Sequence, residues 1–447
     1  MNKQSTYLLD NPSDALKPSE MPKLLFMAGL ASTITYALTK ISLGNIAKIS
    51  SIIFIVLGVW ASLYYTKKRF LRFAYQLLVL SIIVQILSWL FSKATHPELA
   101  LDAPDIEYLS RLFIIIPIAW WLAGKTRNVL LLWLAASIGI VTAPWLRGDG
   151  VEEILLGLQG TRVDFNISNA QHPSLFFGTL LLGLLTLHKR FWSSKKYFYI
   201  PVIAWVALVI FSLIIVVITQ TRSNWLALAV TAAFAVIAIF IKAIKQRAYK
   251  LFFSFLIIFA VLVASLHLTF RDILSNRVSA ESEVVELLLN GNIEEIPYTS
   301  IGIRIHSWRA GLEAFLEKPL LGWGPNGKTL AIQESSKIPQ YIKDDYGHLH
   351  NTYLEILVNF GIIGFAIFSI FIGWVVKSLI MAKKTKKMPE DIFLFSILAL
   401  IFWSITNIFE SYLMFWTGVF LFNIVLGGAL TYIHSESKEK AAAYHHG

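Results

Sequence analysis

The chain has 447 residues, of which 56% are hydrophobic and only 15% are charged, whereas about 25% of the residues in a soluble globular protein are charged. Continuous apolar stretches such as residues 200–219 are long enough to cross about 30 Å of hydrocarbon as a helix. Composition therefore excludes a soluble protein. Because the stretches lack period-2 alternation, we expect an all-α, polytopic membrane protein rather than a membrane barrel.

The apolar stretches predict about 12 transmembrane helices. In chain order they are residues 24–43, 50–66, 70–91, 109–123, 128–146, 173–187, 199–219, 224–241, 251–270, 352–376, 392–409 and 412–433. Helices 1–9 fall within residues 24–270 and helices 10–12 within residues 352–433. We expect residues 1–23 and 434–447 to be cytoplasmic, and residues 271–351 to form a large, mostly helical periplasmic loop domain.

Lys and Arg (39) outnumber Asp and Glu (28), an excess that can indicate nucleic-acid binding. The basic residues instead concentrate in every second loop, in the clusters Lys67–Arg69, Lys125/Arg127, Lys189–Lys196, Lys242–Lys250 and Lys383–Lys387. The positive-inside rule assigns these loops to the cytoplasm. Topology thus explains the basic excess and no nucleic-acid partner is expected, while residues 92–108, 147–172 and 271–351 lie on the outer side.

The largest outer loop contains two predicted helices, at residues 280–290 and 307–317, and the second is ended by Pro319. The glycine-rich stretch 322–327 predicts a turn, and residues 328–349 are expected to form an irregular connection back to the membrane.

At that return to the membrane, Thr352 and Glu355 have the spacing of a capping box, which predicts a helix beginning at Thr352. His348 and His350 would then lie just above the bilayer surface, at the positive end of the helix dipole. Gly361 and Gly364 lie further along the same helix, where the absence of side chains would let a neighbouring helix approach closely.

Arginines and histidines are the polar residues of most chemical interest on the outer side. Arg222 separates two apolar stretches and can reach the headgroup layer, although interfacial anchoring explains such a residue as well. Arg304 and Arg309 flank His306 and Trp308, and for Arg309 a solvated helix face is the preferred interpretation. For His348 and His350, the alternative to a chemical role is a structural one, either in helix capping or as side chains at the membrane interface.

A His-x-His pair can bind metal, but a zinc site needs three or four converging ligands. The chain has no cysteine, no H-E-x-x-H motif and no D-x-D pair, so we expect neither a metal nor another cofactor. Arginines bind phosphate oxygens in pairs of hydrogen bonds and remain charged. Arginines and a histidine at this level therefore indicate a polyprenyl pyrophosphate, whose lipid tail dissolves among the helices. If a sugar is attached, the pyrophosphate is its leaving group, and a neutral histidine can take the proton of the attacking hydroxyl.

The sequence also resembles the O-antigen ligase family of bacterial inner-membrane glycosyltransferases. The family pattern H-[NSQ]-x9-G-x-x-[GTY] is met by His350, Asn351, Gly361 and Gly364. Its R-x3-L pattern is met by Arg222 and Leu226, and its loop arginine ahead of a tryptophan by Arg304 with Trp308. Gly322, Gly324 and Asn326 are also in the style of the family. The motifs cover roughly residues 200–430, and residues 1–170 agree in hydropathy only.

The resemblance implies transfer of O-antigen glycan from undecaprenyl pyrophosphate to lipid A core, without metal, on the periplasmic face of a Gram-negative inner membrane. It implies that His350 is the base and that Arg222 and Arg304 hold the pyrophosphate. Further candidate residues are His348, Arg309, Arg162, His172 and Asn351, with Asn166, Asn169 and Glu410 as weaker candidates.

Three other functions stay open at this point. An O-antigen polymerase or a protein O-oligosaccharyltransferase would use similar residues with a different acceptor. A lipid-linked oligosaccharide flippase also has about a dozen helices, but it is disfavoured because the predicted spans carry almost no charge.

Overall fold

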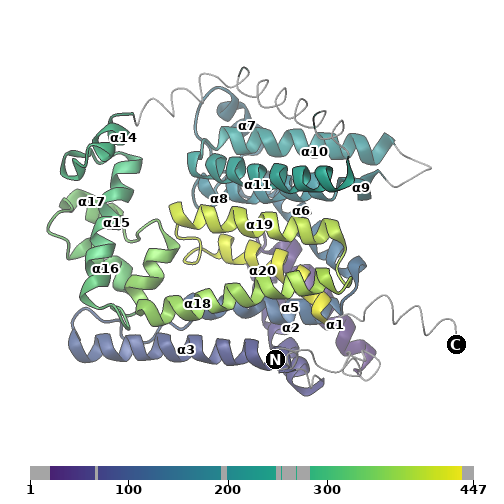
Figure 1. The fold of residues 1–447 in the computed structure, drawn as a ribbon, viewed down its shortest axis with the longest axis horizontal. Helices are drawn as coiled ribbons and strands as arrows, with labels where there is room; N and C mark the ends of the chain where they lie inside the picture. Colours follow the sequence, from purple (N-terminus) through teal and green to yellow (C-terminus); the bar gives the residue numbers. More distant parts are fainter. Residues whose placement is uncertain are drawn as a thin grey trace.

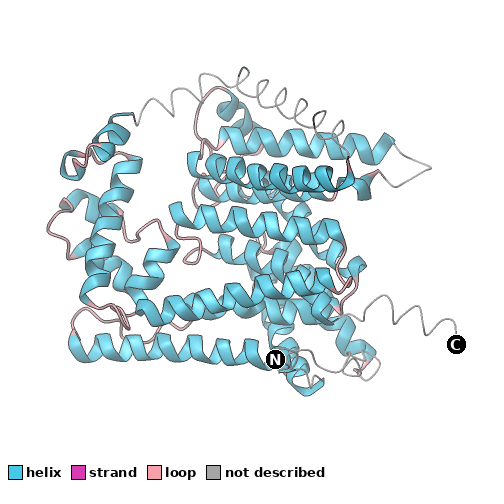
Figure 2. Ribbon diagram, viewed as in Figure 1, coloured by secondary structure: helices cyan, strands magenta, loops and turns pink. Residues whose placement is uncertain are grey.

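The computed structural model describes residues 21–65, 69–192, 199–247, 253, 268 and 282–434. Every regular element in these residues is a helix (Figure 2), so the all-α prediction is confirmed. The predicted span 251–270, apart from two single residues, lies outside the described residues, as do both predicted cytoplasmic termini for nearly all of their length.

The first half of the chain forms a series of helices that are labelled in Figure 1. They are α1 (Lys23–Thr39), α2 (Gly44–Tyr65), α3 (Arg69–Thr95), α4 (Glu107–Ser110), η3 (Arg111–Ile114), α5 (Ile115–Leu122), α6 (Thr126–Arg147), α7 (Val151–Leu158), α8 (Gln171–Thr186), α9 (His188–Phe191), α10 (Tyr199–Ile218) and α11 (Arg222–Gln246). The second half contains α14 (Ser282–Leu289), η4 (Ile293–Glu295), α15 (Ser300–Glu317), α16 (Gly327–Gln333), α17 (Gln340–Asp345), α18 (Thr352–Lys384), α19 (Glu390–Phe409), α20 (Trp416–Leu430) and η5 (Thr431–His434).

Eight helices of the described residues are long and apolar enough to cross a membrane, as a multi-pass membrane protein requires. Three other predicted spans form shorter helices. Residues 24–43 give the 17-residue α1, residues 173–187 the 16-residue α8, and residues 109–123 the succession α4, η3 and α5. All residues of α5 and most of α8 are buried, so these segments are surrounded by protein and need not match the lipid thickness.

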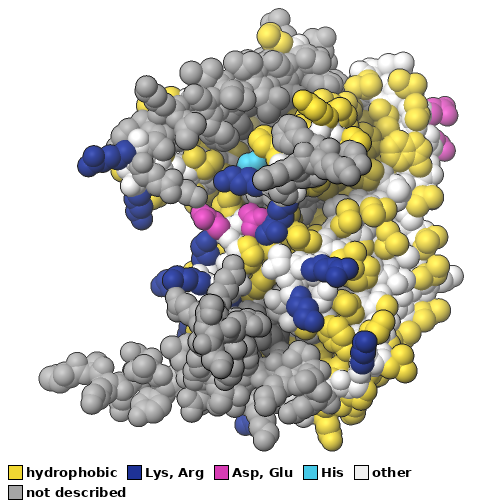
Figure 3. All heavy atoms as spheres, turned by 90° about the vertical axis from the view of Figure 1, so that its right-hand side faces the viewer, with side chains coloured by type: hydrophobic (Ala, Val, Ile, Leu, Met, Phe, Trp, Pro, Cys, Tyr) yellow, Lys and Arg dark blue, Asp and Glu magenta, His cyan; other side chains and the backbone are white. Residues whose placement is uncertain are grey.

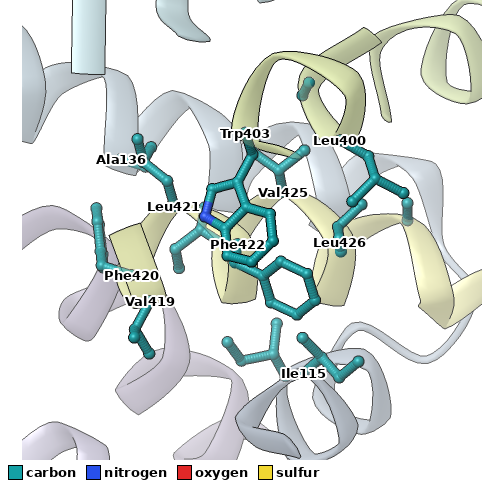
Figure 4. Close-up of a cluster of buried hydrophobic side chains, with 14 of the residues drawn as sticks. Ile115, Ala136, Leu400, Trp403, Val419, Phe420, Leu421, Phe422, Val425 and Leu426 are labelled. Atoms are coloured by element: carbon teal, nitrogen blue, oxygen red, sulfur yellow. The ribbon is translucent and has the colours of Figure 1, made fainter. Parts of the chain in front are cut away.

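The apolar core lies where α20 is enclosed by α5, α6, α8 and α19. All residues from Thr417 to Leu430 are buried, so α20 is the central helix of the bundle. In the core, the Trp403 ring lies 4.8 Å from the Phe422 ring (Figure 4). The Trp403 indole donates to the carbonyl of Gly418 at 3.1 Å. Its single polar atom is thereby satisfied inside the core.

The long helices run back and forth between two ends of the bundle (Figure 1). At one end, Arg190 pairs with Asp391 at 2.5 Å and the Thr126 hydroxyl contacts that of Tyr432 at 2.8 Å. Lys and Arg side chains gather there (Figure 3), and we call it the basic end. The opposite end carries residues 282–351, and we call it the loop end. Assignment of the basic end to the cytoplasm follows from the positive-inside rule and stays a prediction.

The described part of the outer loop is more helical than the sequence predicts. The helix expected at 307–317 begins earlier, at Ser300, because the Thr299 hydroxyl caps it by accepting from Gly302 N at 3.3 Å. The connection expected to be irregular contains α16 and α17. Both helices pack with α15 around Ile303, Ile332 and Ile342 in a separate small core.

Helix α18 begins at Thr352 as predicted, but the predicted capping box is wrong. The cap is Asn351, whose side-chain oxygen accepts from Tyr353 N and Leu354 N at 3.1 Å each. Glu355 does not reach back to the cap and instead binds groups on other elements. Asn is a strong helix cap, and it stands one residue before the predicted one.

The prediction for Gly361 and Gly364 is that a neighbouring helix approaches them closely, whereas the nearest atoms at Gly361 belong to the loop segment after α15. Gly361 has φ +63° and interrupts the helical geometry of α18. A Cβ atom there would lie 2.1 Å from the Leu320 carbonyl oxygen. The loop segment at Pro319 and Leu320 fills the break, since their carbonyls accept from Ile362 N (2.8 Å) and Ile363 N (3.4 Å). At Gly364 a Cβ would meet Phe360 of the same helix.

We expect Gly361→Ala to destabilise the protein by about 3 kcal/mol or more, because it adds a strained backbone conformation to a backbone clash. The apparent Tm in detergent, followed by tryptophan fluorescence, should fall by several degrees. The matched control is Gly373→Ala in the same helix, where an added Cβ meets nothing within 4 Å. Equal melting temperatures for the two variants would contradict this account.

Candidate active site at the loop end

Four parts of the chain contribute polar side chains to one cluster at the loop end. His348 and His350 precede α18, and Glu410 follows α19. Arg304 comes from α15 and Arg222 is the first residue of α11. The ligand atoms of His348, His350 and Glu410 lie within 4.8 Å of one another.

Glu410 is the negative centre of this cluster and is completely buried. Its carboxylate accepts from His348 Nε2 at 3.2 Å, from Ser411 N at 2.9 Å and from the Gln171 side-chain amide. Burial raises the pKa of Glu410, but the hydrogen bond from His348 and the charges of His350 and His348 outweigh burial and lower this pKa to about 2. Glu410 is therefore ionised at neutral pH.

His348 is the ion-pair partner of Glu410. Burial lowers the pKa of His348, but the hydrogen bond to Glu410 and the charge of that carboxylate raise it by more, so its pKa lies above the ordinary value of 6.5. The His348 ring stacks on that of His350, with centroids 4.0 Å apart. The His348–Glu410 pair therefore lies directly beside the second histidine.

The pKa of His350 is shifted in the opposite direction to that of His348. Burial lowers its pKa to about 4, with smaller lowering contributions from His348 and Arg304, while Glu410 opposes the change. Its Nδ1 atom is buried and has no hydrogen-bond partner among the described residues. The backbone of His350 has φ +52°, a left-handed conformation that costs a non-glycine residue energy. The structure thus holds a neutral imidazole with one unused nitrogen.

Arg304 and Arg222 supply positive charge to the same region. Arg304 Nη1 donates to the carbonyl and the hydroxyl of Ser300 at 3.2 and 3.3 Å, while its Nε is buried without a partner among the described residues. Burial and the charge of Arg222 lower the pKa of Arg304, and Glu410 opposes this change. The charges of Arg222 and Glu410 therefore both act on Arg304, although the three residues are far apart in sequence.

The remaining predicted site residues have other partners. Arg309 pairs with Glu294 (3.2 Å) and Glu313 (3.3 Å) on the surface of the loop. Arg162 Nε donates to the carbonyl of Thr219, just before Arg222. Asn351 is occupied as the cap of α18. The site roles of these residues stay predictions.

Residues 166–172 form the end of the predicted outer loop 147–172. Asn166 donates to the carbonyl of Arg147, and the Asn169 side chain accepts from Gln171 N. His172 is completely buried, its Nδ1 lies 2.6 Å from the Thr417 hydroxyl, and its Nε2 has no partner among the described residues. The charges of Glu410 and His348 act on the His172 ring, so it borders the cluster.

Sequence reasoning missed the structural role of Glu355. This carboxylate is completely buried and accepts from Tyr108 Oη (2.5 Å), Ser411 Oγ (2.5 Å) and Leu349 N (3.0 Å). Leu349 separates the two histidines, so Glu355 fixes the segment that carries them. An acidic residue within a predicted membrane span is a signal of such a role.

His348, His350 and Glu410 also have the types of ligand that bind zinc. Two observations argue against a metal ion bound between these three residues. Glu410 already accepts hydrogen bonds from three donors, and the charges of neighbouring Arg304 and Arg222 would repel a cation. The arrangement fits a hydrogen-bonded network that handles protons and binds an anion.

Fold and site together define a multi-pass helical membrane protein with a basic and histidine-containing site at one end. Residues 206–369 match the family described as O-antigen ligase. Over this segment the chain is similar to the O-antigen ligase family, in agreement with the resemblance of its motifs. Arg222, Arg304 and His350 lie inside the matched segment, whereas Glu410 follows it.

An uncharacterized protein of Haemophilus influenzae is 35% identical to the chain over 89 residues. The match spans 20% of this chain and 21% of the length of that relative. A local likeness of this extent says nothing about the activity of the whole protein.

We expect Glu355→Ala to lower the apparent Tm more strongly than Tyr108→Phe. The first variant leaves buried donors without an acceptor, each of which costs about 1–3 kcal/mol, whereas the second removes one hydrogen bond worth about 1 kcal/mol. Glu334→Ala, at an exposed position of the outer loop 282–351, is the control. A Glu355→Ala variant as stable as the control would contradict the role assigned to this carboxylate.

Proposed function

We propose that the protein is an O-antigen ligase that transfers glycan from undecaprenyl pyrophosphate to lipid A core. The observation that carries this proposal is the neutral, buried His350 with an unused nitrogen, close to Arg304 and beside the His348–Glu410 pair. The family match supports the reaction type. The identity of donor and acceptor, and the periplasmic face of a Gram-negative inner membrane as location, are part of the proposal.

In this mechanism His350 is the general base. The oxygen of the acceptor hydroxyl attacks the anomeric carbon of the donor, and its proton passes to a ring nitrogen of His350. The bond from the anomeric carbon to the pyrophosphate oxygen breaks, and its electron pair leaves with the undecaprenyl pyrophosphate. A single displacement of this kind inverts the anomeric centre, in keeping with one base and no protein nucleophile.

Arg304 and Arg222 take the role that a metal has in many sugar transfers. Their guanidinium groups would bind the phosphate oxygens and stabilise the negative charge that develops as the donor bond breaks. The unpartnered Nε of Arg304 offers a donor that the protein itself does not use. A low-dielectric surrounding strengthens such an interaction.

The His348–Glu410 pair would support the base in two ways. The His348 ring stacks on that of His350 and lowers its pKa, which helps to keep His350 neutral before reaction. The Glu410 carboxylate opposes that effect and stabilises the imidazolium once the proton has been transferred. Glu410 thus acts as a positioning and electrostatic residue.

An O-antigen polymerase and a protein O-oligosaccharyltransferase are alternative functions for the same site, since they differ in the acceptor. A flippase would leave the arrangement of base and arginines without a chemical role. The identity of the covalent product distinguishes these alternatives.

The first test uses purified protein in nanodiscs, with EDTA present, and undecaprenyl-pyrophosphate glycan with or without lipid A core. We expect glycan on lipid A core with wild type and a loss of about 1,000-fold or more with His350→Ala, because the base is removed. His96→Ala, a half-exposed histidine at the same end, is the control. Lengthened lipid-linked glycan alone would identify a polymerase, a glycosylated protein an oligosaccharyltransferase, and retained anomeric configuration would exclude direct displacement.

A second test concerns pH. Because His350 must be neutral to accept a proton and its pKa is about 4 rather than 6.5, kcat/KM should hold from neutral pH to about pH 5 and fall only as the pH approaches 4. Rates measured over this range in nanodiscs, with folding checked at each pH, give the profile. An acidic limb centred near pH 6.5 would contradict a base that is held neutral by burial.

A further inference from the structure

Helix α15 and the turn after it expose a stripe of leucines. Leu312, Leu316 and Leu320 are 51%, 65% and 64% exposed, respectively. Leu312 and Leu316 lie one helical turn apart on one face, and Leu320 follows the end of the helix at Glu317. Exposed apolar stripes of this kind mark surfaces that contact something other than water.

The faces of α15 next to and opposite the leucine stripe have different surroundings. At about 100° per residue, Leu312 lies opposite Ile303 and Ala310, which face the small core shared with α16 and α17. On one flank, the ring of Trp308 lies 6.3 Å from that of Phe409 at the end of α19. The stripe therefore lies at the rim of the membrane bundle and not on the part of the loop furthest from it.

The other flank of the stripe is charged. Arg309 and Glu313 form an ion pair at 3.3 Å, and Lys337 approaches Glu313 at 2.6 Å. An apolar face with protein on one side and ion pairs on the other is the profile of a helix that lies in a membrane interface.

The stripe is continuous with the exposed apolar surface of α18, which is long and apolar enough to cross a membrane. The carbonyls of Pro319 and Leu320 bind the backbone amides of Ile362 and Ile363 in α18, and these isoleucine side chains are 45% and 43% exposed. Residues 361–384 rise about 36 Å at about 1.5 Å per residue, which is close to the hydrocarbon thickness of about 30 Å. The break at Gly361 and the adjoining Leu320 therefore lie at the boundary of the hydrocarbon.

Basic side chains lie at the same level. Lys318 Nζ is 3.7 Å from the centre of the Trp323 ring and 3.2 Å from the Thr95 hydroxyl at the end of α3. Lys93 lies half-buried within the last turn of α3. Lysines at helix ends place their ammonium groups at the phosphates of lipid headgroups.

We propose that Leu312, Leu316 and Leu320 insert into the acyl chains of the membrane leaflet at the loop end, with Lys318 and Lys93 at the level of the phosphates. The partner is bulk membrane lipid. Helix α15 is then anchored in the membrane surface, two to three turns from Arg304 on the same helix. This proposal needs only a multi-pass membrane protein and does not depend on the transferase function.

The chain contains no cysteine, so single-cysteine variants carry one spin label each. Leu312→Cys and Leu316→Cys would be labelled in nanodiscs, and collisions with oxygen, which enriches in lipid, compared with those of a water-soluble nickel complex. Ile370→Cys, 51% exposed in the middle of α18, is the lipid reference, and Glu334→Cys, exposed on the loop, is the water reference. We expect Leu316→Cys to show an oxygen-to-nickel ratio several-fold above that of Glu334→Cys, approaching that of Ile370→Cys.

Two results would overturn the proposal. Nickel accessibility at Leu312 and Leu316 equal to that at Glu334 would place the stripe in water. An immobilised label protected from both oxygen and nickel would show that a protein, such as a second copy of the chain, covers the stripe. Because the measurement needs no substrate, its outcome is independent of whether the protein transfers glycan.

Discussion

Two carboxylates that are completely buried at the loop end, Glu355 and Glu410, determine how the surrounding elements meet. Burying a charge costs several kcal/mol unless hydrogen bonds replace the lost water. The donors to Glu355 come from α4, from the segment before α18 and from the link between α19 and α20. Those to Glu410 include the start of α8. The histidine-bearing segment between α17 and α18 can therefore take only the conformations that satisfy both carboxylates.

This constraint moves the pKa values of two neighbouring histidines in opposite directions. Glu410 raises the pKa of His348, which it contacts directly, while burial dominates for His350 and lowers its pKa. Pairs of titratable groups whose environments move their pKa values apart are the usual sign of divided roles in acid–base chemistry. The left-handed backbone of His350 is a further cost, and the hydrogen bond from Leu349 N to Glu355 is part of what offsets it.

The sequence was sufficient for features that depend on composition and local spacing. Apolar length predicts the long spans, and the motif residues Arg222, Arg304 and His350 are gathered at one end by the alternation of helices. It was insufficient where partners are distant in the chain. Glu355 has capping-box spacing, yet its hydrogen bonds to Tyr108 and Ser411 outweigh that local choice. Likewise, no local pattern shows that a loop, and not a helix, fills the space at Gly361.

The break at Gly361 explains how one 33-residue helix serves two environments. After the break, α18 is long enough to cross the hydrocarbon, whereas Asn351 and Glu355 before it belong to the polar site. Charged groups cost far less in the headgroup layer than in the hydrocarbon centre. The arginines and the His348–Glu410 pair lie on the loop-end side of the break at Gly361. The protein can therefore hold a charged site at the loop end while the part of α18 after the break stays largely apolar. The lipid-linked pyrophosphate of the proposed function has the same division, with a charged head and an apolar tail, and this correspondence is part of the reason for proposing it.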